Sequence, residues 1–319
     1  MASLHEVVDR VAEQTGFSGV VRVDRGPELL LECARGLADR RHGQRMRVDS
    51  QLAMASGSKT FTALVVMRLV EQGRLRLDTK ARSLLGADLP LVDRGVTVEQ
   101  LLSHRSGIGD YLDEDEPVPD YPMPVSVHRL AETIDYLAVL DGHATKFAPE
   151  QRFSYCNGGY VVLALLAERA AGRSFHDLVE ELVCRPAGMT GTAYLRSDCL
   201  PGRAAVGYVE TPTGWRTNVF HLPVRGSGDG GCFTTVADMR RFWMALTAGR
   251  IVSPATWADM TRSRTPRSEG PQYGLGCRLH DTAPTVYLIG CDTGVSMRSW
   301  HDPPTAVTAT IMSTTTHGA

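Results

Sequence analysis

The chain reads Ser56-Gly57-Ser58-Lys59 directly before an apolar run from Thr60 to Gln72. Residues of this run are apolar on nearly every side of a helix, a pattern typical of a helix that is buried all round. Gly73 indicates the end of the helix, and Ser56 is expected as its N-cap or as a first-turn residue. The sequence therefore predicts one buried helix that carries Ser56 and Lys59 at its start.

Lys59 stands out because only three of the 34 lysine and arginine residues are lysines. Arginine holds its charge, whereas a desolvated lysine ammonium can release its proton and act as a base. Ser56 and Lys59 are one helical turn apart, near the positive end of the helix dipole. An adjacent base activates a serine as a nucleophile. The alternative interpretation is a serine that caps the helix beside a solvated lysine.

Tyr155 and Asn157 lie about a hundred residues further on, in a predicted loop before a second apolar helix from Val161 to about Ala171. The tyrosine hydroxyl can relay a proton if Lys59 lowers its pKa, and Asn157 can hydrogen-bond both a lysine and a substrate amide. The alternative is an aromatic turn followed by a helix cap.

With both motifs in place, the chain resembles the serine β-lactamase and penicillin-binding-protein superfamily, in its class C-like, esterase-like branch. The resemblance extends over most of the chain. One segment is similar to that branch's Leu-Leu-x-His-x-Ser-Gly signature. The segments that carry the resemblance beyond the two motifs are Leu101 to Ile108, Arg185 to Met189 and Gly230 to Met239.

The resemblance implies that Ser56 is the acylated nucleophile and Lys59 its partner base. Tyr155 would pass a proton to and from the leaving group, and Asn157 would orient the substrate. The backbone N–H of Ser56 would form half of an oxyanion hole, which is worth roughly 10²–10³ in rate per donor. No cofactor is implied, and the histidines show no metal-ligand spacing, so no metal is expected.

The third family motif, Lys-Thr-Gly or His-x-Gly, is changed in this chain. The matching stretch runs from Gly290 to Ser296, and either Cys291 replaces the cation or a shifted alignment gives Asp292-Thr293-Gly294. We assign these last three residues to substrate binding. Neither alignment supplies the cation that receives a substrate carboxylate in many family members, although Arg298 is a candidate substitute. Ester or amide substrates without that carboxylate are favoured over β-lactams.

Composition agrees with a soluble, globular enzyme, and the resemblance implies a small-molecule substrate. Hydrophobic residues make up 43% and charged residues 22% of the chain, and the net charge of −2 gives no reason to expect a nucleic-acid or membrane partner. No signal peptide is evident after Met1, so a cytoplasmic location is expected. Seven cysteines are expected as free thiols; a thiol nucleophile or disulfide involving Cys156 or Cys291 is the alternative.

The expected fold class is α+β, with an antiparallel sheet flanked by helices and a mostly helical region, similar to β-lactamases and transpeptidases. Residues 1–78 and 214–319 are assigned to the sheet region and 79–213 to the helical region of one continuous unit. Strands are expected at 19–23, 29–33, 273–279, 285–289, 294–301 and 306–312. Further helices are expected near 97–102, 127–140, 160–171 and 175–183. The acidic and proline-rich residues 110–124 are expected as a loop or, alternatively, a lid.

Two patterns are assigned no chemistry. The run Gly226 to Gly231 matches a dinucleotide-binding fingerprint formally, but no βαβ unit surrounds it, so we expect a tight turn near the pocket. His104 and His301 are interpreted as structural.

Two alternatives to hydrolysis stay open: acyl transfer to an alcohol or amine, and a catalytically inactive sensor or binding protein. The oligomeric state is not predicted.

Overall fold

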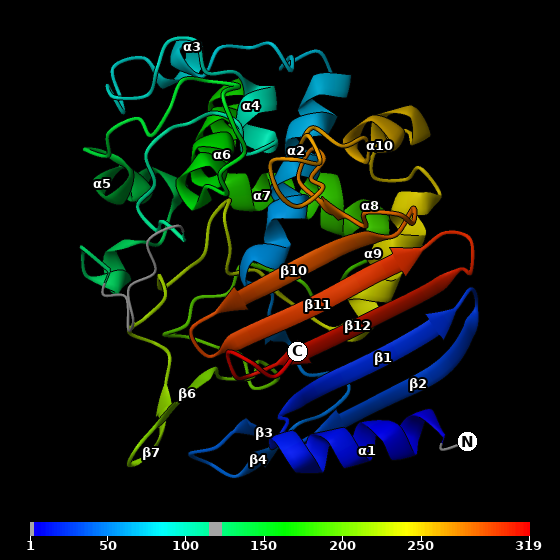
Figure 1. Ribbon diagram of the computed structural model, residues 1–319. Helices are drawn as coiled ribbons and strands as arrows, with labels where there is room; N and C mark the ends of the chain where they lie inside the picture. Colours follow the sequence, from blue (N-terminus) through cyan, green and yellow to red (C-terminus); the bar gives the residue numbers. More distant parts are fainter. Residues whose placement is uncertain (1–2, 115–122) are drawn as a thin grey trace.

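The structure is a computed structural model that describes residues 3–114 and 123–319 (Figure 1). Part of the predicted acidic and proline-rich loop, including Glu116, Pro117, Pro119 and Pro122, lies outside the described residues.

A six-stranded antiparallel sheet forms one layer of the protein, with the strand order β2-β1-β12-β11-β10-β9. The chain begins the sheet with one hairpin and completes it with its last strands, so the two ends meet where β1 pairs with β12. The strands are β1 (Gly19–Arg25), β2 (Glu28–Arg35), β9 (Arg278–Leu279), β10 (Val286–Asp292), β11 (Val295–Asp302) and β12 (Val307–Ser313). The predicted antiparallel sheet built from terminal strands is confirmed.

The strand expected over 273–279 is wrong for most of its length. Only Arg278 and Leu279 belong to β9. Gly276 has φ 86, and the backbone N–H groups of Leu275 and Gly276 bond the carbonyls of Met260 and Leu102 instead of the sheet. The segment is therefore diverted towards the helical layer before it can pair.

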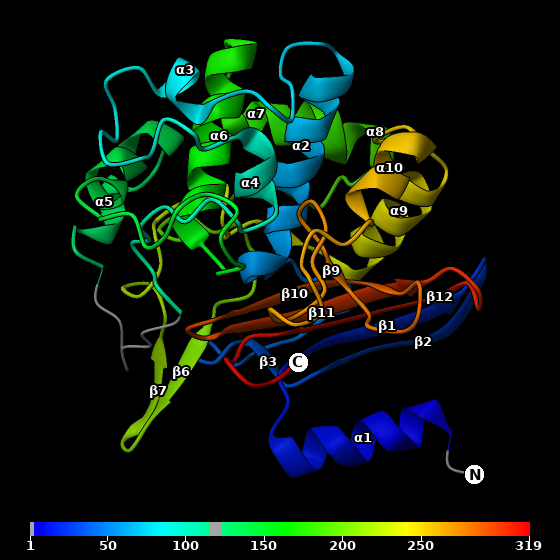
Figure 2. The same ribbon diagram turned by 45° about the horizontal axis from the view of Figure 1, so that its top comes forward.

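Figure 2 shows the sheet edge-on, with α1 (Leu4–Thr15) on one face and the remaining helices on the other. Beneath α1 lies a small apolar cluster that contains Val21, Leu31 and Cys33. The main core fills the opposite side, where α9 packs against β12 and β1. The helices on that side are α2 (Lys59–Glu71), α3 (Ala81–Leu85), α4 (Val98–Leu102), α5 (Leu137–Leu140), α6 (Asn157–Ala171), α7 (Phe175–Val179), α8 (Arg185–Ala187), α9 (Val236–Thr247) and α10 (Pro254–Met260).

The predicted buried helix is confirmed as α2, which begins one residue earlier than expected. Ten of its 13 residues are buried, so the helix contacts protein on nearly all sides. The second apolar helix is α6, which packs against α2 and starts at Asn157. Predicted helices near 97–102 and 175–183 are present as α4 and as α7 with the π-helical turn η4 (Glu180–Cys184).

A single helix over 127–140 is not formed. The segment contains the 3₁₀ turns η2 (Val127–Arg129) and η3 (Thr133–Tyr136), followed by the short α5. The carbonyls of Val127 and Leu130 accept bonds from the backbone N–H groups of Val224 and Arg225. Because these carbonyls serve a tertiary contact, they are not available to continue a helix.

Three short two-stranded ladders complete the fold. β5 (Leu52–Ala53) pairs with β8 (Phe233–Thr234), which brings the chain before Ser56 beside the segment after the glycine-rich run. The other ladders join β3 (Leu37–Asp39) to β4 (Gln44–Arg45) and β6 (Tyr208–Thr211) to β7 (Gly214–Thr217). Helices α9 and α10 lie within the stretch 214–319 that we assigned to the sheet region. No helix of the described part is both long and apolar enough to cross a membrane.

Candidate active site

Ser56 lies in a 3₁₀ turn, η1 (Ala55–Ser58), that leads directly into α2. Ala55 has φ 44, an uncommon conformation for a residue with a side chain. Gly57 N bonds Met54 O at 2.9 Å, and Met54 N bonds Cys232 O at 2.8 Å, so both ends of the bend are fixed. Ser56 is partly exposed, and it does not cap α2, contrary to one expectation. In the first turn of a helix its backbone N–H has no intrahelical acceptor and is free for another role.

Lys59 is buried, at 2% exposure, and its ammonium makes three hydrogen bonds. Lys59 Nζ lies 3.0 Å from Ser56 Oγ, 2.7 Å from Asn157 Oδ1 and 2.7 Å from the Asp229 carbonyl oxygen. An ammonium donates to all three, whereas a neutral amine donates to the Asn157 and Asp229 oxygens and accepts from the Ser56 hydroxyl. The amide and carbonyl oxygens can only accept, whereas the serine hydroxyl carries a proton. Ser56 is therefore the one partner of the three with which Lys59 can exchange a proton.

Asn157 is oriented by the elements around the start of α6. Its Nδ2 donates to Leu112 O at 2.8 Å, which leaves Oδ1 to face Lys59. Asp110 accepts the backbone N–H groups of Asn157 and Gly158 at 2.6 and 2.7 Å, and so holds the N-terminal turn of α6. Burial nevertheless raises the pKa of Asp110 to about 6. The starts of α2 and α6 thus meet at the Lys59–Asn157 contact.

The glycine-rich run 226–231 is the predicted tight turn, and it supplies the third Lys59 contact. A Cβ on Gly228 would lie 2.0 Å from the Tyr160 carbonyl oxygen, so a side chain has no room there. Thr62 Oγ1 donates to Gly228 O at 2.6 Å, which ties the turn to α2. The role of the Asp229 carbonyl was not predicted; the glycine run was its only sequence signal.

Tyr155 is partly buried beside the Ser–Lys pair. Lys59 Nζ lies 4.9 Å from the centre of the Tyr155 ring. The centre of the His104 ring lies 4.4 Å from the same point, with the two ring planes inclined by 35°. The condition stated for a Tyr155 relay, a pKa lowered by Lys59, is not met. Burial raises this pKa, Glu114 raises it further, and hydrogen bonding to Ser56 and the charge of Arg278 oppose the shift only in part. The hydroxyl therefore keeps its proton at neutral pH.

His104 has the structural position that was expected. Its Nδ1 accepts the backbone N–H of Cys156 at 3.0 Å, and burial lowers its pKa well below the usual value. The neutral ring thus supports the loop that carries Tyr155. His301 is also structural, because it stacks on Trp243 and bonds Thr308.

The third-motif stretch forms the β10–β11 hairpin, and its strand β10 runs directly past the Ser56 turn. A Cβ on Gly290 would lie 1.9 Å from Met54 O, so only glycine permits this approach. Asp292, Thr293 and Gly294 line the same cavity as Ser56. Arg298 is exposed and lies outside that lining, so it does not serve as the substitute cation. Arg278, which sequence reasoning missed, lies 5.7 Å from the Tyr155 ring centre.

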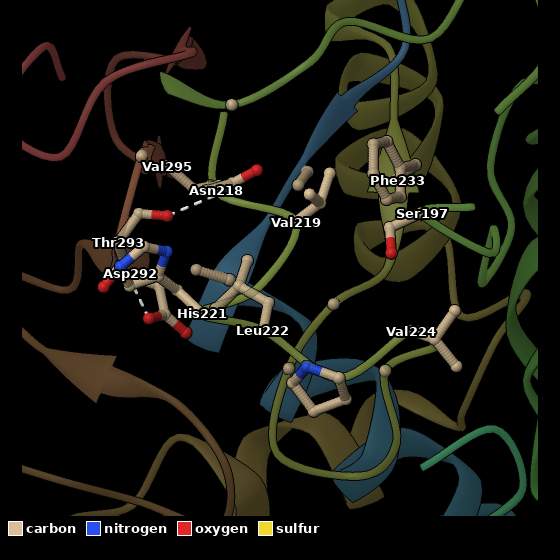
Figure 3. Close-up of a pocket in the computed structure, with 18 of the residues that line it drawn as sticks. Ser197, Asn218, Val219, His221, Leu222, Val224, Phe233, Asp292, Thr293 and Val295 are labelled. Carbon is tan, nitrogen blue, oxygen red and sulfur yellow. Dashed lines mark hydrogen bonds between the residues drawn. The ribbon is translucent and has the colours of Figure 1, made fainter. Parts of the chain in front are cut away.

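The cavity beside Ser56 has a volume of about 220 Å³. Figure 3 shows Asp292 and Thr293 on one side of it, with Phe233 and Val224 on the other and Val219 and Leu222 between them. Asn218 Nδ2 donates to Thr293 O at 2.9 Å and so fixes the tip of the β10–β11 hairpin. The cavity therefore has a polar end at the hairpin and an apolar end opposite.

All seven cysteines are free thiols, as expected. Cys156 caps α6, and its Sγ accepts the Gly159 N–H, but burial raises its pKa well above the usual value. The alternative of a Cys156 nucleophile therefore has no support, since a thiol attacks as its thiolate. Cys291 is exposed as a residue, but partial burial of its thiol raises the pKa of that thiol as well.

The antiparallel sheet, the two buried helices α2 and α6 and the turn that carries Ser56 and Lys59 are together typical of the penicillin-binding and β-lactamase class of proteins. The solved structure of a penicillin-binding protein from Bacillus halodurans superposes with a TM-score of 0.91 at 30% identity, and the match covers 98% of this chain and 96% of that one. The family model described as Beta-lactamase matches residues 4–319. The chain belongs to the beta-lactamase family.

Curated relatives have several different activities in their names. Penicillin-binding protein 4* of Bacillus subtilis is 29% identical over 88% of this chain and 63% of its own length. Esterase EstB of Burkholderia gladioli is 29% identical over 86% of this chain and 78% of its own length. D-aminopeptidase of Brucella anthropi is 30% identical over 89% of this chain. The chain spans 63% and 52% of the lengths of the first and third of these relatives.

Proposed function

We propose that the protein is a serine hydrolase that forms an acyl-enzyme on Ser56 and favours ester substrates. The observation that carries the proposal is the hydrogen bond from Lys59 to Ser56, held in place by two partners that can only accept. This is the nucleophile–base pair of covalent catalysis, with the base oriented by further groups. Membership of a family whose relatives include an esterase and a D-aminopeptidase agrees with it.

The proposed reaction starts from the neutral amine of Lys59, whose two protons stay hydrogen-bonded to Asn157 Oδ1 and the Asp229 carbonyl oxygen. Ser56 Oγ bonds the substrate carbonyl carbon while its proton passes to the lone pair of Lys59 Nζ. The bond to the leaving group breaks as the Tyr155 hydroxyl gives that group a proton, and Lys59 returns a proton to Tyr155. The raised pKa of Tyr155 suits this role, because the hydroxyl arrives protonated. Water then attacks the acyl carbonyl by the reverse route and releases the acid. The Ser56 backbone N–H supports the oxyanion in both halves.

Ester and amide substrates without a carboxylate fit the cavity better than β-lactams. Within the part of the chain that the structure describes, the lining of this cavity contains no lysine or arginine to receive a carboxylate; Lys59 and Arg278 line a separate, smaller hollow at Ser56. Asn157 uses both ends of its side-chain amide, since Oδ1 accepts from Lys59 and Nδ2 donates to the Leu112 carbonyl. Its proposed role is therefore to position Lys59 as well as to line the cavity.

Intact-mass spectrometry tests the proposed function. Wild type and Ser56→Ala are incubated with p-nitrophenyl butanoate and, separately, with a penicillin. We expect a transient butanoyl adduct and turnover on the wild type alone. A long-lived penicilloyl adduct with no ester turnover would replace hydrolysis with a penicillin-binding role. Equal turnover by Ser56→Ala, or no adduct with either reagent, would contradict the proposal and support the inactive sensor.

Acyl transfer is the second candidate, because an alcohol or amine that enters the cavity can replace water after the acyl-enzyme forms. Adding an alcohol at rising concentration separates the two: transfer yields a new ester in proportion, and hydrolysis yields only the acid.

We also propose a cytoplasmic location. Seven free thiols, of which Cys199 and Cys291 are exposed, suit a reducing compartment. Cell fractionation of the native host with an antibody against the protein tests the location; recovery in the medium would contradict it.

A further inference from the structure

The cavity beside Ser56 is acidic on the side of the β10–β11 hairpin. Its described lining contains two carboxylates, Asp229 and Asp292, one histidine, His221, and no lysine or arginine. Asp229 is engaged inside the protein, since the Tyr111 hydroxyl donates to its carboxylate. Asp292 is therefore the carboxylate that a bound substrate meets.

Asp292 has no counterion among the residues that the structure describes. Its Oδ1 accepts the backbone N–H of Thr293 at 2.7 Å, which fixes the direction of the side chain. The carboxylate is partly buried at the end of β10. A partly buried charge without a partner costs stability, and such costs are typical of functional positions.

Neighbouring charges make this end of the cavity more negative. Glu114 accepts from Asn157 Nδ2 at 3.3 Å and adds its charge near Asp292. Burial raises the pKa of Asp292 to about 6, and repulsion from Asp229 and Glu114 acts in the same direction, while Lys59 opposes it. A substrate cation relieves this repulsion, whereas a substrate carboxylate increases it.

The opposite end of the cavity accepts an apolar group. It is formed by Phe233 and Val224, with Ser197 beside them, and Val219 and Leu222 continue the apolar wall towards the hairpin (Figure 3). Apolar walls with one placed charge are the usual composition of a small-molecule site, in which the polar group fixes orientation.

We propose that Asp292 binds a positively charged group of the substrate, so that the protein selects ammonium-bearing esters or amides and rejects those with a free carboxylate at the same place. Asp292 is thus a specificity-determining residue. The inference rests on the proposed function, since it names the substrate class of the same site.

Three p-nitrophenyl esters with matched chains test the selectivity: 4-(trimethylammonio)butanoate, its uncharged isostere 5,5-dimethylhexanoate, and the half-ester of glutarate. A single charge pair across a partly exposed site is worth on the order of tenfold. We expect kcat/KM at pH 8 to be on the order of tenfold higher for the cationic ester than for the isostere, and lowest for the anionic one. The leaving-group side is tested by choline butanoate against 3,3-dimethylbutyl butanoate.

Asp292→Asn is the decisive variant, because asparagine keeps an oxygen for the Thr293 N–H and removes the charge. We expect its cationic-to-neutral ratio to fall close to one for the ester pair that shows selectivity. Asp78→Asn is the matched control: it removes an exposed carboxylate paired with Arg76, outside the cavity lining, and should keep the wild-type ratio. No cationic preference in the wild type with either pair, or a preference that survives in Asp292→Asn, overturns the inference.

Binding to Ser56→Ala separates this inference from the proposed function. Calorimetry with the cationic ester and its isostere measures affinity where no acyl-enzyme can form. A dissociation constant on the order of tenfold lower for the cation in Ser56→Ala, lost in Ser56→Ala/Asp292→Asn, supports the inference even if the wild type turns over no ester. Equal affinities contradict it even if the acyl-enzyme is observed.

Discussion

Lys59 Nζ and Ser56 Oγ are 3.0 Å apart, and two further hydrogen bonds of Lys59 Nζ, to Asn157 Oδ1 and to the Asp229 carbonyl oxygen, fix its position. These two contacts direct two N–H groups of Lys59 away from the serine, so the third position of the nitrogen faces Ser56 Oγ. Any change that keeps the charge of residue 59 but alters its shape breaks this geometry.

Lys59→Arg tests that geometry. A guanidinium keeps the charge but is planar and does not give up its proton, so it cannot act as a base for Ser56. We expect acylation, measured as the single-turnover burst with p-nitrophenyl butanoate, to fall by about 10²–10⁴. Arg68→Lys, near the other end of the same helix, is the control, and it should keep the wild-type acylation rate. An acylation rate within about threefold of wild type in Lys59→Arg would exclude Lys59 as the base.

Tyr155→Phe keeps the ring against His104 and Lys59 and removes only the hydroxyl. Because the raised pKa of Tyr155 keeps its proton in place, loss of the hydroxyl removes a proton donor to the leaving group. We expect kcat to fall by about 10²-fold or more for alkyl esters, whose leaving alkoxides need a proton, and much less for p-nitrophenyl esters. Steady-state kinetics with both ester types check this. An equal loss for both would assign Tyr155 to the attack step.

Gly290→Ala tests the approach of β10 to the Ser56 turn. The added Cβ would lie 1.9 Å from Met54 O, so either the strand or the turn must move. We expect the free energy of unfolding to fall by about 1–3 kcal/mol, as for overpacked cores, together with a loss of ester turnover. Urea denaturation followed by circular dichroism measures the first. Gly202→Ala, where no atom lies within 4 Å of the new Cβ, should change stability by less than about 0.5 kcal/mol.

Asp292→Asn should change how stability depends on pH. The native carboxyl, with a pKa of about 6, binds its proton more tightly than the unfolded chain, in which aspartate titrates near ~3.9. Native wild type therefore holds more protons than the unfolded state between these values, and its stability falls as pH rises from about 4 to about 6. The asparagine variant lacks this loss.

We therefore expect Asp292→Asn to gain about 1–3 kcal/mol relative to wild type between pH 4 and pH 7, the range reflecting solvent screening of a partly exposed group. Urea denaturation of both proteins across this pH range measures the difference, in which contributions from other groups largely cancel. A difference that does not vary with pH would show that Asp292 is not destabilised by its surroundings.

Local patterns predicted the two buried helices and most of the sheet correctly. The helices of Lys59 and Asn157 are apolar almost throughout, and the strands of the β10–β11–β12 meander follow one another directly along the chain. The failures came where distant backbone competes for hydrogen bonds. Val127 and Leu130 lose their helix to contacts with residues 224–225, and the segment before Arg278 loses its strand to the helical layer.

The sequence by itself determined that Ser56 and Lys59 lie together, because three residues along a helix make one turn whatever surrounds it. Only the tertiary structure decided what else meets this pair. The Asp229 carbonyl, the Tyr155 environment and the Asp292 charge reach the site from segments far apart in sequence. Their positions depend on packing between the sheet and two buried helices, and so does the direction of the Tyr155 pKa shift, since burial is a property of the whole fold.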